Sequence, residues 1–163
     1  MIIQRLWAVA ASVAVLCATQ ALADPKPKGA KRLDAQTVAN MYAGKTVPWK
    51  TCKGGIFFGA KFQAQSYCNK SGPSVGLGKW KVTSKGSICH ELVYYWPQGD
   101  SFGSKPQDKN PDCINHLVDA DGQIWHNWLS DNDWWRGFPK DKNFSKGNKY
   151  KRQIAKNRKK LGV

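Results

Sequence analysis

Two stretches of the chain alternate apolar and polar residues on both sides of a short turn that ends in glycine. The first covers residues 79–96 and turns at Gly86, and the second covers residues 113–129 and turns at Gly122. An alternation of two is the period of a β-strand, and a three-residue hairpin loop needs positive φ at its last position, which glycine adopts at the least cost. The pattern predicts two antiparallel hairpins at the centre of one small β domain.

The turns also predict which residues face each other across the strands. Counting outward from the first turn places Trp80 opposite His90, and counting from the second places His116 opposite His126. The same counts give the pairs Val82–Ile88, Val118–Ile124 and Ile114–Trp128. All three histidines therefore fall on faces that are otherwise apolar.

Two interpretations of His90, His116 and His126 stay open. In the first, neutral imidazoles lie at the edge of the core, hydrogen-bonded and stacked on tryptophans. In the second, the three residues bind a ligand or a metal, or respond to protons, because facing imidazoles can share a cation and repel each other when protonated. No His-x-His spacing supports a metal site, so the first interpretation is favoured.

Shorter elements are predicted around the hairpins. Asp34 is the expected N-cap of a helix over residues 35–43 that ends at Gly44 and covers one end of the sheet. Strands are predicted over residues 46–50, 56–58, 61–67, 75–83 and 131–138, and residues 97–111 are predicted as a long loop. The expected fold is mainly β: a small antiparallel β-barrel or sandwich with one short N-terminal helix and a basic C-terminal tail.

The N-terminal residues have the features of a secretory signal peptide. Arg5 gives a positive start, residues 6–18 form an apolar run, and Ala23 ends a small-x-small cleavage pattern. The run is too short to span a bilayer, and no later segment reaches the roughly 18 apolar residues that a span requires. We expect a signal peptide over 1–23, a basic linker over 24–32, a β domain over 33–139, a basic tail over 140–163, and a periplasmic or secreted product; a retained N-terminal anchor is the alternative.

Four cysteines follow the predicted cleavage point: Cys52, Cys68, Cys89 and Cys113. An even number in an exported protein favours disulfides, and four cysteines allow three pairings. We favour Cys52–Cys68 and Cys89–Cys113, because each bond would join neighbouring segments. The alternative is a four-cysteine zinc site, but it lacks a Cys-x-x-Cys spacing.

The formal net charge of +15 is concentrated at the ends of the chain. Residues 33–139 carry eleven Lys and Arg against nine acids, whereas residues 140–160 carry ten basic residues against Asp141 alone. The predicted polyanion-binding residues are Lys149, Lys151, Arg152, Lys156, Arg158, Lys159 and Lys160. Such a tail attracts lipid phosphates, acidic polysaccharide, nucleic acid or an acidic protein, and a merely solvated tail is the alternative. A helix over 148–161 would have a thin apolar face and would need a packing partner.

Candidate chemistry is sparse. Trp134 and Trp135 point to opposite sides of an extended backbone, so one of them, beside Arg136, is a candidate stacking surface for a sugar or a base, the alternative being an aromatic strand that closes the core. No phosphate-binding loop, serine-hydrolase or zinc-protease motif occurs. We therefore predict no catalytic residue and no cofactor.

Several of these residues also occur in a pattern known from a protein family. Gly78-Lys79-Trp80-Lys81-Val82, then Ile88-Cys89, then Cys113 with Asp121-Gly122, preceded by the stretch 41–46, resembles the exported alphaproteobacterial proteins grouped as domain of unknown function 995. The resemblance covers about residues 33–129. It implies a periplasmic or secreted bacterial protein with a small β-rich domain and no established catalytic residues, and it leaves the basic C-terminus outside the pattern.

Three hypotheses follow from the sequence. The leading one is a non-catalytic binding protein of the bacterial envelope whose basic ends attract an anionic polymer or lipid surface. The second is a secreted inhibitor or host-directed factor that presents residues 97–111 to a protein target. The third is a hydrolase with an unrecognised site.

Overall fold

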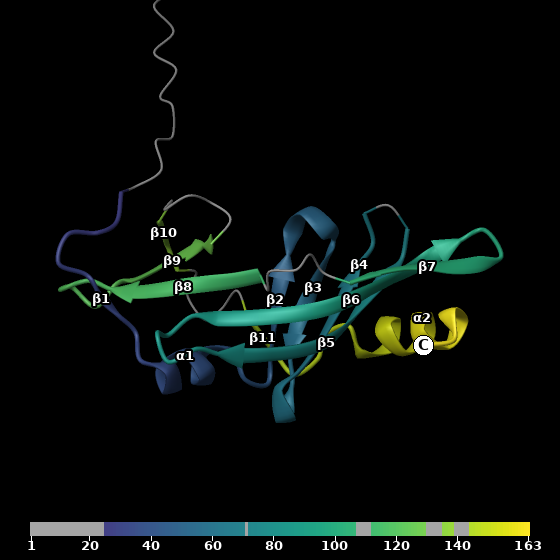
Figure 1. Cartoon of the computed structure of the whole chain (residues 1–163), viewed down its shortest axis with the longest axis horizontal. Helices are drawn as coiled ribbons and strands as arrows, with labels where there is room; N and C mark the ends of the chain where they lie inside the picture. Colours follow the sequence, from purple (N-terminus) through teal and green to yellow (C-terminus); the bar gives the residue numbers. More distant parts are fainter. Residues whose placement is uncertain (1–24, 71, 107–111, 130–134, 139–143) are drawn as a thin grey trace, which may run out of the picture.

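In the described part of the chain, one antiparallel sheet of eleven strands curls into a half-barrel, and two short α-helices pack against it (Figure 1). The computed structural model describes residues 25–70, 72–106, 112–129, 135–138 and 144–163, and the predicted signal peptide lies outside them. The predicted class, mainly antiparallel β with a short N-terminal helix, is confirmed. No helix in these ranges is long and apolar enough to cross a membrane.

The elements follow one another with short connections. In chain order they are β1 (Lys31–Arg32), α1 (Ala35–Tyr42), β2 (Lys45–Trp49), β3 (Gly54–Phe58), β4 (Gln63–Cys68), β5 (Ser74–Val82), β6 (Ile88–Gln98), β7 (Ser101–Pro106), β8 (Asp112–Val118), β9 (Ile124–Trp128), β10 (Arg136–Gly137), β11 (Ser145–Lys146) and α2 (Lys151–Leu161). The strand order is β10-β9-β8-β6-β5-β4-β3-β2-β11, with β1 paired to β8 and β7 paired to β6 outside this path. The last two residues of the predicted linker over 24–32 form β1 and thus belong to the sheet.

Both central hairpins have the predicted register. Trp80 pairs with His90 across β5 and β6, and His116 pairs with His126 across β8 and β9. Both turns close at a glycine with positive φ, which is 71° at Gly86 and 77° at Gly122. The Gly86 amide donates to the Thr83 carbonyl at 2.9 Å, as a three-residue loop requires.

The longest strand, β6, has two different neighbours along the same edge. Residues 88–90 pair with β8, whereas residues 93–98 pair with β7. The prediction of a loop over 97–111 is therefore wrong for its first part, because β6 continues to Gln98 and β7 follows after a tight turn; residues 107–111 lie outside the described ranges. Pro97 and Pro106 hid this hairpin, since proline interrupts the usual strand pattern but is accepted at an edge.

The two faces of the sheet bury different clusters. Residues at even positions of β5 and β6 point into the half-barrel, where Trp80, Ile88 and Leu92 pack with Phe58 and with α1. Asp34 caps α1 as predicted, accepting a hydrogen bond from the Thr37 amide at 2.8 Å. The helix contributes Val38 and Tyr42, which are among the least exposed side chains, so α1 closes one end of the half-barrel.

The opposite face of β5 is covered by the C-terminal helix. Ile154 and Leu161 of α2 pack on Val75, and the Tyr150 ring stacks on Tyr67 with ring centroids 5.5 Å apart. Burying two such aliphatic side chains is worth roughly 3–6 kcal/mol before the entropy of ordering is subtracted. The chain reaches this position through β11, which pairs with β2. The thin apolar face of the tail thus has the packing partner that the sequence indicated it would need.

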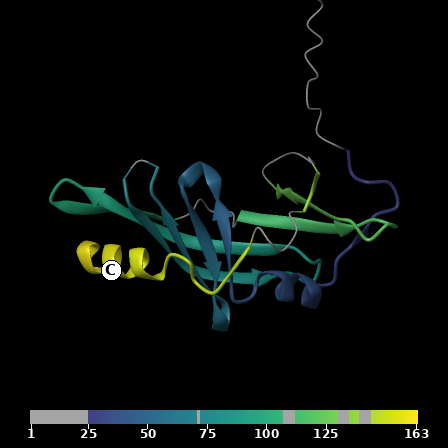
Figure 2. The same ribbon diagram turned by 180° about the vertical axis from the view of Figure 1, so that it is seen from behind.

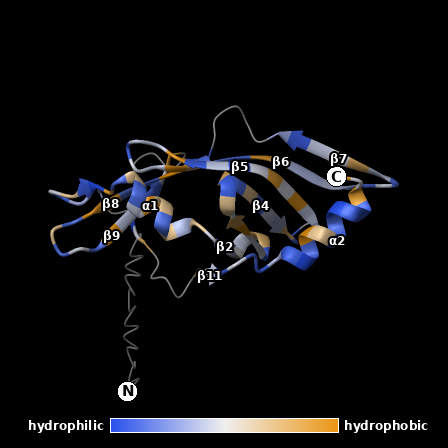
Figure 3. Cartoon of the chain, turned by 90° about the horizontal axis from the view of Figure 1, so that it is seen from below, coloured by the Kyte–Doolittle hydropathy of each residue, from blue (hydrophilic) through white to orange (hydrophobic). Residues whose placement is uncertain are grey.

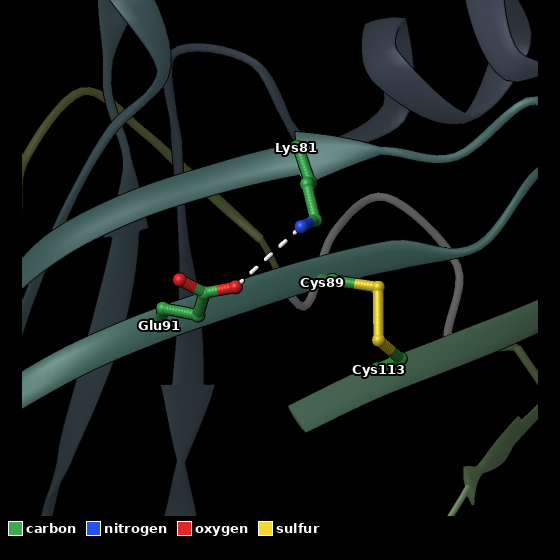
Figure 4. Close-up of polar contacts among 4 residues, drawn as sticks. All are labelled: Lys81, Cys89, Glu91 and Cys113. Atoms are coloured by element: carbon green, nitrogen blue, oxygen red, sulfur yellow. Dashed lines mark hydrogen bonds and ion pairs between the residues drawn. A yellow bond between two sulfur atoms is a disulfide. The ribbon is translucent and has the colours of Figure 1, made fainter. Parts of the chain in front are cut away.

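Both favoured disulfide pairings are confirmed. Cys52 bonds to Cys68, with Cα atoms 4.9 Å apart, and Cys89 bonds to Cys113, with Cα atoms 4.1 Å apart. Figure 4 shows the second bond joining β6 to β8 near the Lys81–Glu91 ion pair, whose charged atoms are 3.5 Å apart. The disulfides therefore fasten the β3–β4 region and the β6–β8 junction separately.

Candidate functional site

Two of the three histidines belong to a buried aromatic cluster. His116 Nε2 lies 2.9 Å from the Tyr42 hydroxyl, which joins β8 to α1. The Phe138 ring lies edge-on to both His116 and His126, at centroid distances of 5.4 and 5.5 Å. The pair that the hairpin register brings face to face is therefore packed under an aromatic residue from the end of the domain.

Burial keeps His116 and Tyr42 of this cluster uncharged at neutral pH. It lowers the pKa of His116 to about 4; the Gly86 backbone opposes this shift, and the neighbouring His126 adds to it. Burial also raises the pKa of the Tyr42 phenol. At neutral pH the contact between them is thus a hydrogen bond between neutral groups, which stabilises the closed end of the half-barrel without a charge.

His90 lies in a different part of the inner face. Its Nε2 has no hydrogen-bond partner among the residues that the structure describes, and it lies 3.9 Å from a carboxylate oxygen of Asp112, the residue that it faces on β8. Burial lowers the pKa of His90, and the charge of Asp112 opposes this shift. Among the residues described, no three His, Cys, Asp or Glu side chains gather closely enough to hold a metal ion.

Two of the three predicted stacking residues, Trp135 and Arg136, lie in the described ranges, and Trp134 lies outside them. Trp135 is buried, and Arg136 is exposed on β10, where it pairs with His126. Trp135 thus belongs to the interior rather than to a ligand surface.

The seven predicted polyanion-binding residues are all exposed. Lys149 precedes α2, and the other six lie on the helix itself, away from the buried side chains of Ile154, Asn157 and Leu161. Neither ion pair recorded within the described ranges involves this helix. Figure 3 shows α2 as a mainly hydrophilic helix laid along the sheet. Six of the seven basic side chains are thus carried by one docked helix, α2.

The sequence analysis missed a groove between the β4–β5 connection and the β6–β7 hairpin. It has a volume of about 520 Å³ and is lined by Cys68, Lys70, Gly72, Pro73, Ser74, Tyr94, Trp96 and Pro97. Tyr94 and Trp96 continue the row of inward residues on β6 beyond Leu92. That alternation was visible in the sequence, but the β7 strand that frames the groove was not.

Three residues of the types that act as nucleophiles or general bases in enzymes are engaged in structural contacts. Cys89 is oxidised, so it cannot act as a thiolate. Glu91 is exposed and paired with Lys81. Asp119 accepts hydrogen bonds from its own turn and from the Trp125 indole, at 2.7 Å for the latter, which lowers the pKa of its carboxyl.

These features define a disulfide-bonded protein built on a curled antiparallel β-sheet, with a basic helix docked on its outer face. The chain belongs to a family described as protein of unknown function DUF995, whose family model matches residues 8–158. The match is wider than the stretch 33–129 that carries the resemblance, and it includes most of the basic C-terminus. No curated protein and no solved structure gives a significant match to the chain.

Proposed function

We propose that this protein is an exported, non-catalytic binding protein of the bacterial envelope that attaches to an anionic lipid surface through α2. The observation that carries the proposal is the docked helix with six exposed basic side chains and no acid of its own. The two disulfides support an oxidising compartment, and the predicted signal peptide supports export.

The packing of α2 adds to the argument from charge. A rise of 1.5 Å per residue places the six cations within about 15 Å along the helix axis. Because Ile154 and Leu161 hold the helix on the sheet, these charges need not be gathered from a disordered chain when the protein binds. Each basic side chain near an anionic membrane is worth about 1 kcal/mol.

Binding to vesicles that contain lipopolysaccharide tests the proposal. The triple variant Lys151→Gln, Lys156→Gln, Lys159→Gln removes three exposed charges while leaving the buried face of α2 intact. We expect its affinity at low salt to fall about 100-fold. Binding of the unchanged protein should itself weaken strongly as salt is raised.

A matched variant distinguishes an effect of the position of the charges on α2 from an effect of the total net charge. Lys61→Gln, Lys79→Gln, Lys85→Gln removes the same number of exposed charges outside α2, and we expect a much smaller loss of affinity. An equal loss in both variants would show that binding follows total charge and would contradict a role for α2. Deleting the tail is less informative, because it would uncover Val75.

The second candidate function is a secreted inhibitor or host-directed factor that binds a protein target. The observation that favours it is the β6–β7 hairpin, which extends from one end of the molecule and exposes 43% of Phe102 (Figure 2). Phe102→Ala should abolish capture of such a target. The same substitution should leave vesicle binding unchanged.

A further inference from the structure

The groove beside the β6–β7 hairpin is separate from the helix that carries the proposed function. Tyr94 and Trp96 belong to the inner face of β6, whereas Tyr95 on the outer face packs in the cluster under α2. A ligand in the groove and an anionic surface on α2 would therefore contact opposite faces of the same sheet.

Trp96 is held with one face of its ring against the backbone of β7. It pairs with Gly103, and a Cβ atom at that glycine would lie 2.5–2.7 Å from three atoms of the indole ring. Similar distances to three ring atoms indicate that the ring covers Gly103 face-on, which only glycine permits. Trp96 is 37% exposed and lines the groove, so its other face is available to a ligand.

The remaining lining residues supply a few polar groups around this platform. Burial raises the pKa of the Tyr94 phenol to about 12, and the charge of Asp112 adds to the shift, so its hydroxyl stays protonated and can both donate and accept hydrogen bonds. Ser74 offers a second hydroxyl. Lys70 is exposed and is the one charged residue among the described residues that line the groove, and Asp112 is not part of this lining.

An apolar platform with few polar groups suits a sugar better than an extended peptide. The axial C–H groups of a pyranose form an apolar face that stacks on a flat aromatic ring, and its hydroxyls match neutral donors and acceptors such as Tyr94 and Ser74. The volume of about 520 Å³ lies within the range of small-ligand sites and leaves room for more than one ring. A single lysine matches the single charge of a carboxylate better than the nearly double charge of a phosphate monoester.

We infer that this groove binds an acidic oligosaccharide, with one pyranose ring stacked on Trp96 and its carboxylate near Lys70. This inference extends the proposed binding role to a second site and does not depend on α2. The site would then recognise a uronic-acid polymer by ring stacking and by one charge contact.

Calorimetric titration of the mature protein with trisaccharides tests the inference. The probes are the galacturonate, glucuronate and mannuronate trisaccharides, a carboxyl-reduced neutral counterpart of each, and a phosphorylated trisaccharide. We expect at least one uronate to bind, about tenfold more tightly than its reduced form. Absence of binding to all uronates at millimolar concentration would overturn the inference, as would equal or tighter binding of the reduced or phosphorylated sugar.

Three substitutions locate the site. Trp96→Ala should weaken uronate binding at least tenfold, and Trp96→Phe should weaken it less. Lys70→Gln should weaken binding of the uronate several-fold and leave the neutral sugar unaffected; because Lys70 is exposed, this result does not depend on the fold of the Trp96 variants. The control Leu129→Ala alters an exposed apolar side chain outside the groove lining and should change nothing. Binding that survives both Trp96→Ala and Lys70→Gln would overturn the assignment.

The α2 triple variant distinguishes the two proposals. We expect it to bind the uronate with unchanged affinity while losing vesicle binding. If it lost both together, the acidic sugar would be binding to the helix and not to the groove. If it bound both the uronate and the vesicles with unchanged affinity, the proposed role of α2 would be contradicted, whereas the assignment of the sugar site to the groove would remain supported.

Discussion

The two ends of the half-barrel use one strand face in opposite ways. At the α1 end, inward residues of β6 such as Ile88 are buried against Phe58 and Tyr42. At the other end the same row continues as Tyr94 and Trp96, which line an open groove. We call these the closed end and the open end. Their difference teaches that the alternation of a strand specifies a face, whereas the elements packed on that face determine whether it becomes core or ligand surface.

The polar groups differ in the same way. At the closed end, the Tyr42 hydroxyl and His116 Nε2 form a hydrogen bond, and both groups remain neutral. On the outer face, the cations of α2 remain exposed to water. Stability should therefore depend mainly on the closed end, and binding on the open end and the helix.

The largest effect should come from the core of the closed end. Phe58 is 1% exposed, so Phe58→Ala should lower the free energy of unfolding by about 3–5 kcal/mol. Phe102 at the open end is 43% exposed, and Phe102→Ala should cost less than about 1 kcal/mol. Urea denaturation with the disulfides intact measures both. Similar costs would show that the two ends are not packed differently.

Protonation of His116 should be the next largest effect. Its pKa falls from 6.5 to about 4 in the folded protein, so unfolding is favoured once the unfolded histidine takes up a proton. The contribution of neutral His116 to the free energy of unfolding is fully present above pH 6.5. It is lost progressively as the pH falls to 4, and the loss for this group amounts to about 3 kcal/mol.

Urea denaturation as a function of pH measures this loss. His116→Gln should be less stable at pH 7 but should show a flatter pH dependence between 6.5 and 4. The carboxyls of Asp34 and Asp119 contribute in a different window, because their pKa values are lowered from 3.8 and their contribution is lost only below that value. An unchanged pH dependence in the His116 variant would contradict a neutral, buried imidazole.

Removing one disulfide should cost about 3 kcal/mol in either case, since the bonds close loops of 16 and 24 residues. The two losses should differ in their effect on the groove. Cys68 lines it, so Cys52→Ser with Cys68→Ser should also weaken binding of the uronate. Cys89→Ser with Cys113→Ser should lower the free energy of unfolding. Under conditions in which this variant is folded, its affinity for the sugar should equal that of the unchanged protein. Calorimetry under folding conditions compares the two.

The smallest effect should come from the exposed ion pair in Figure 4. Lys81 and Glu91 each have side chains that are 62% exposed, so solvent screens their attraction. Glu91→Gln should change the free energy of unfolding by less than about 0.5 kcal/mol. A larger change, measured by urea denaturation, would show that this outward face of β5 and β6 is covered by something else.

Local signals explain what could be predicted from the sequence. Gly86 and Gly122 each specify a turn, and a turn specifies its strand register, so the pairing of His116 with His126 followed from counting alone. The disulfides followed because each favoured pairing joins segments that are neighbours along the chain. Asp34 likewise predicted the start of α1, because its capping hydrogen bond is local and reaches only to the amide of Thr37.

What could not be predicted depends on contacts between distant segments. The strand β7 contains Gly103 and ends at Pro106, and both residues weaken the sequence pattern of a strand. The reason for a glycine at position 103 is visible only in the structure, where the ring of Trp96 leaves no room for a Cβ atom. The docking of α2 requires the patch around Val75, 79 residues before Ile154 along the chain, and a thin apolar face does not reveal its partner. The groove depends on the first of these features, the pairing of β7 with β6 beside Trp96, and was therefore missed.

Hydrogen exchange of the amides from Ile154 to Leu161 tests the central claim most directly, because the account requires α2 to be docked before any ligand binds. In the free protein we predict slow exchange for these amides, comparable to β5 beneath them and little changed by lipopolysaccharide vesicles. Ile154→Ala should speed their exchange without affecting the amides of β8. Exchange at the rate of an unfolded chain in the free protein would contradict the account, because the basic helix would then form only on binding.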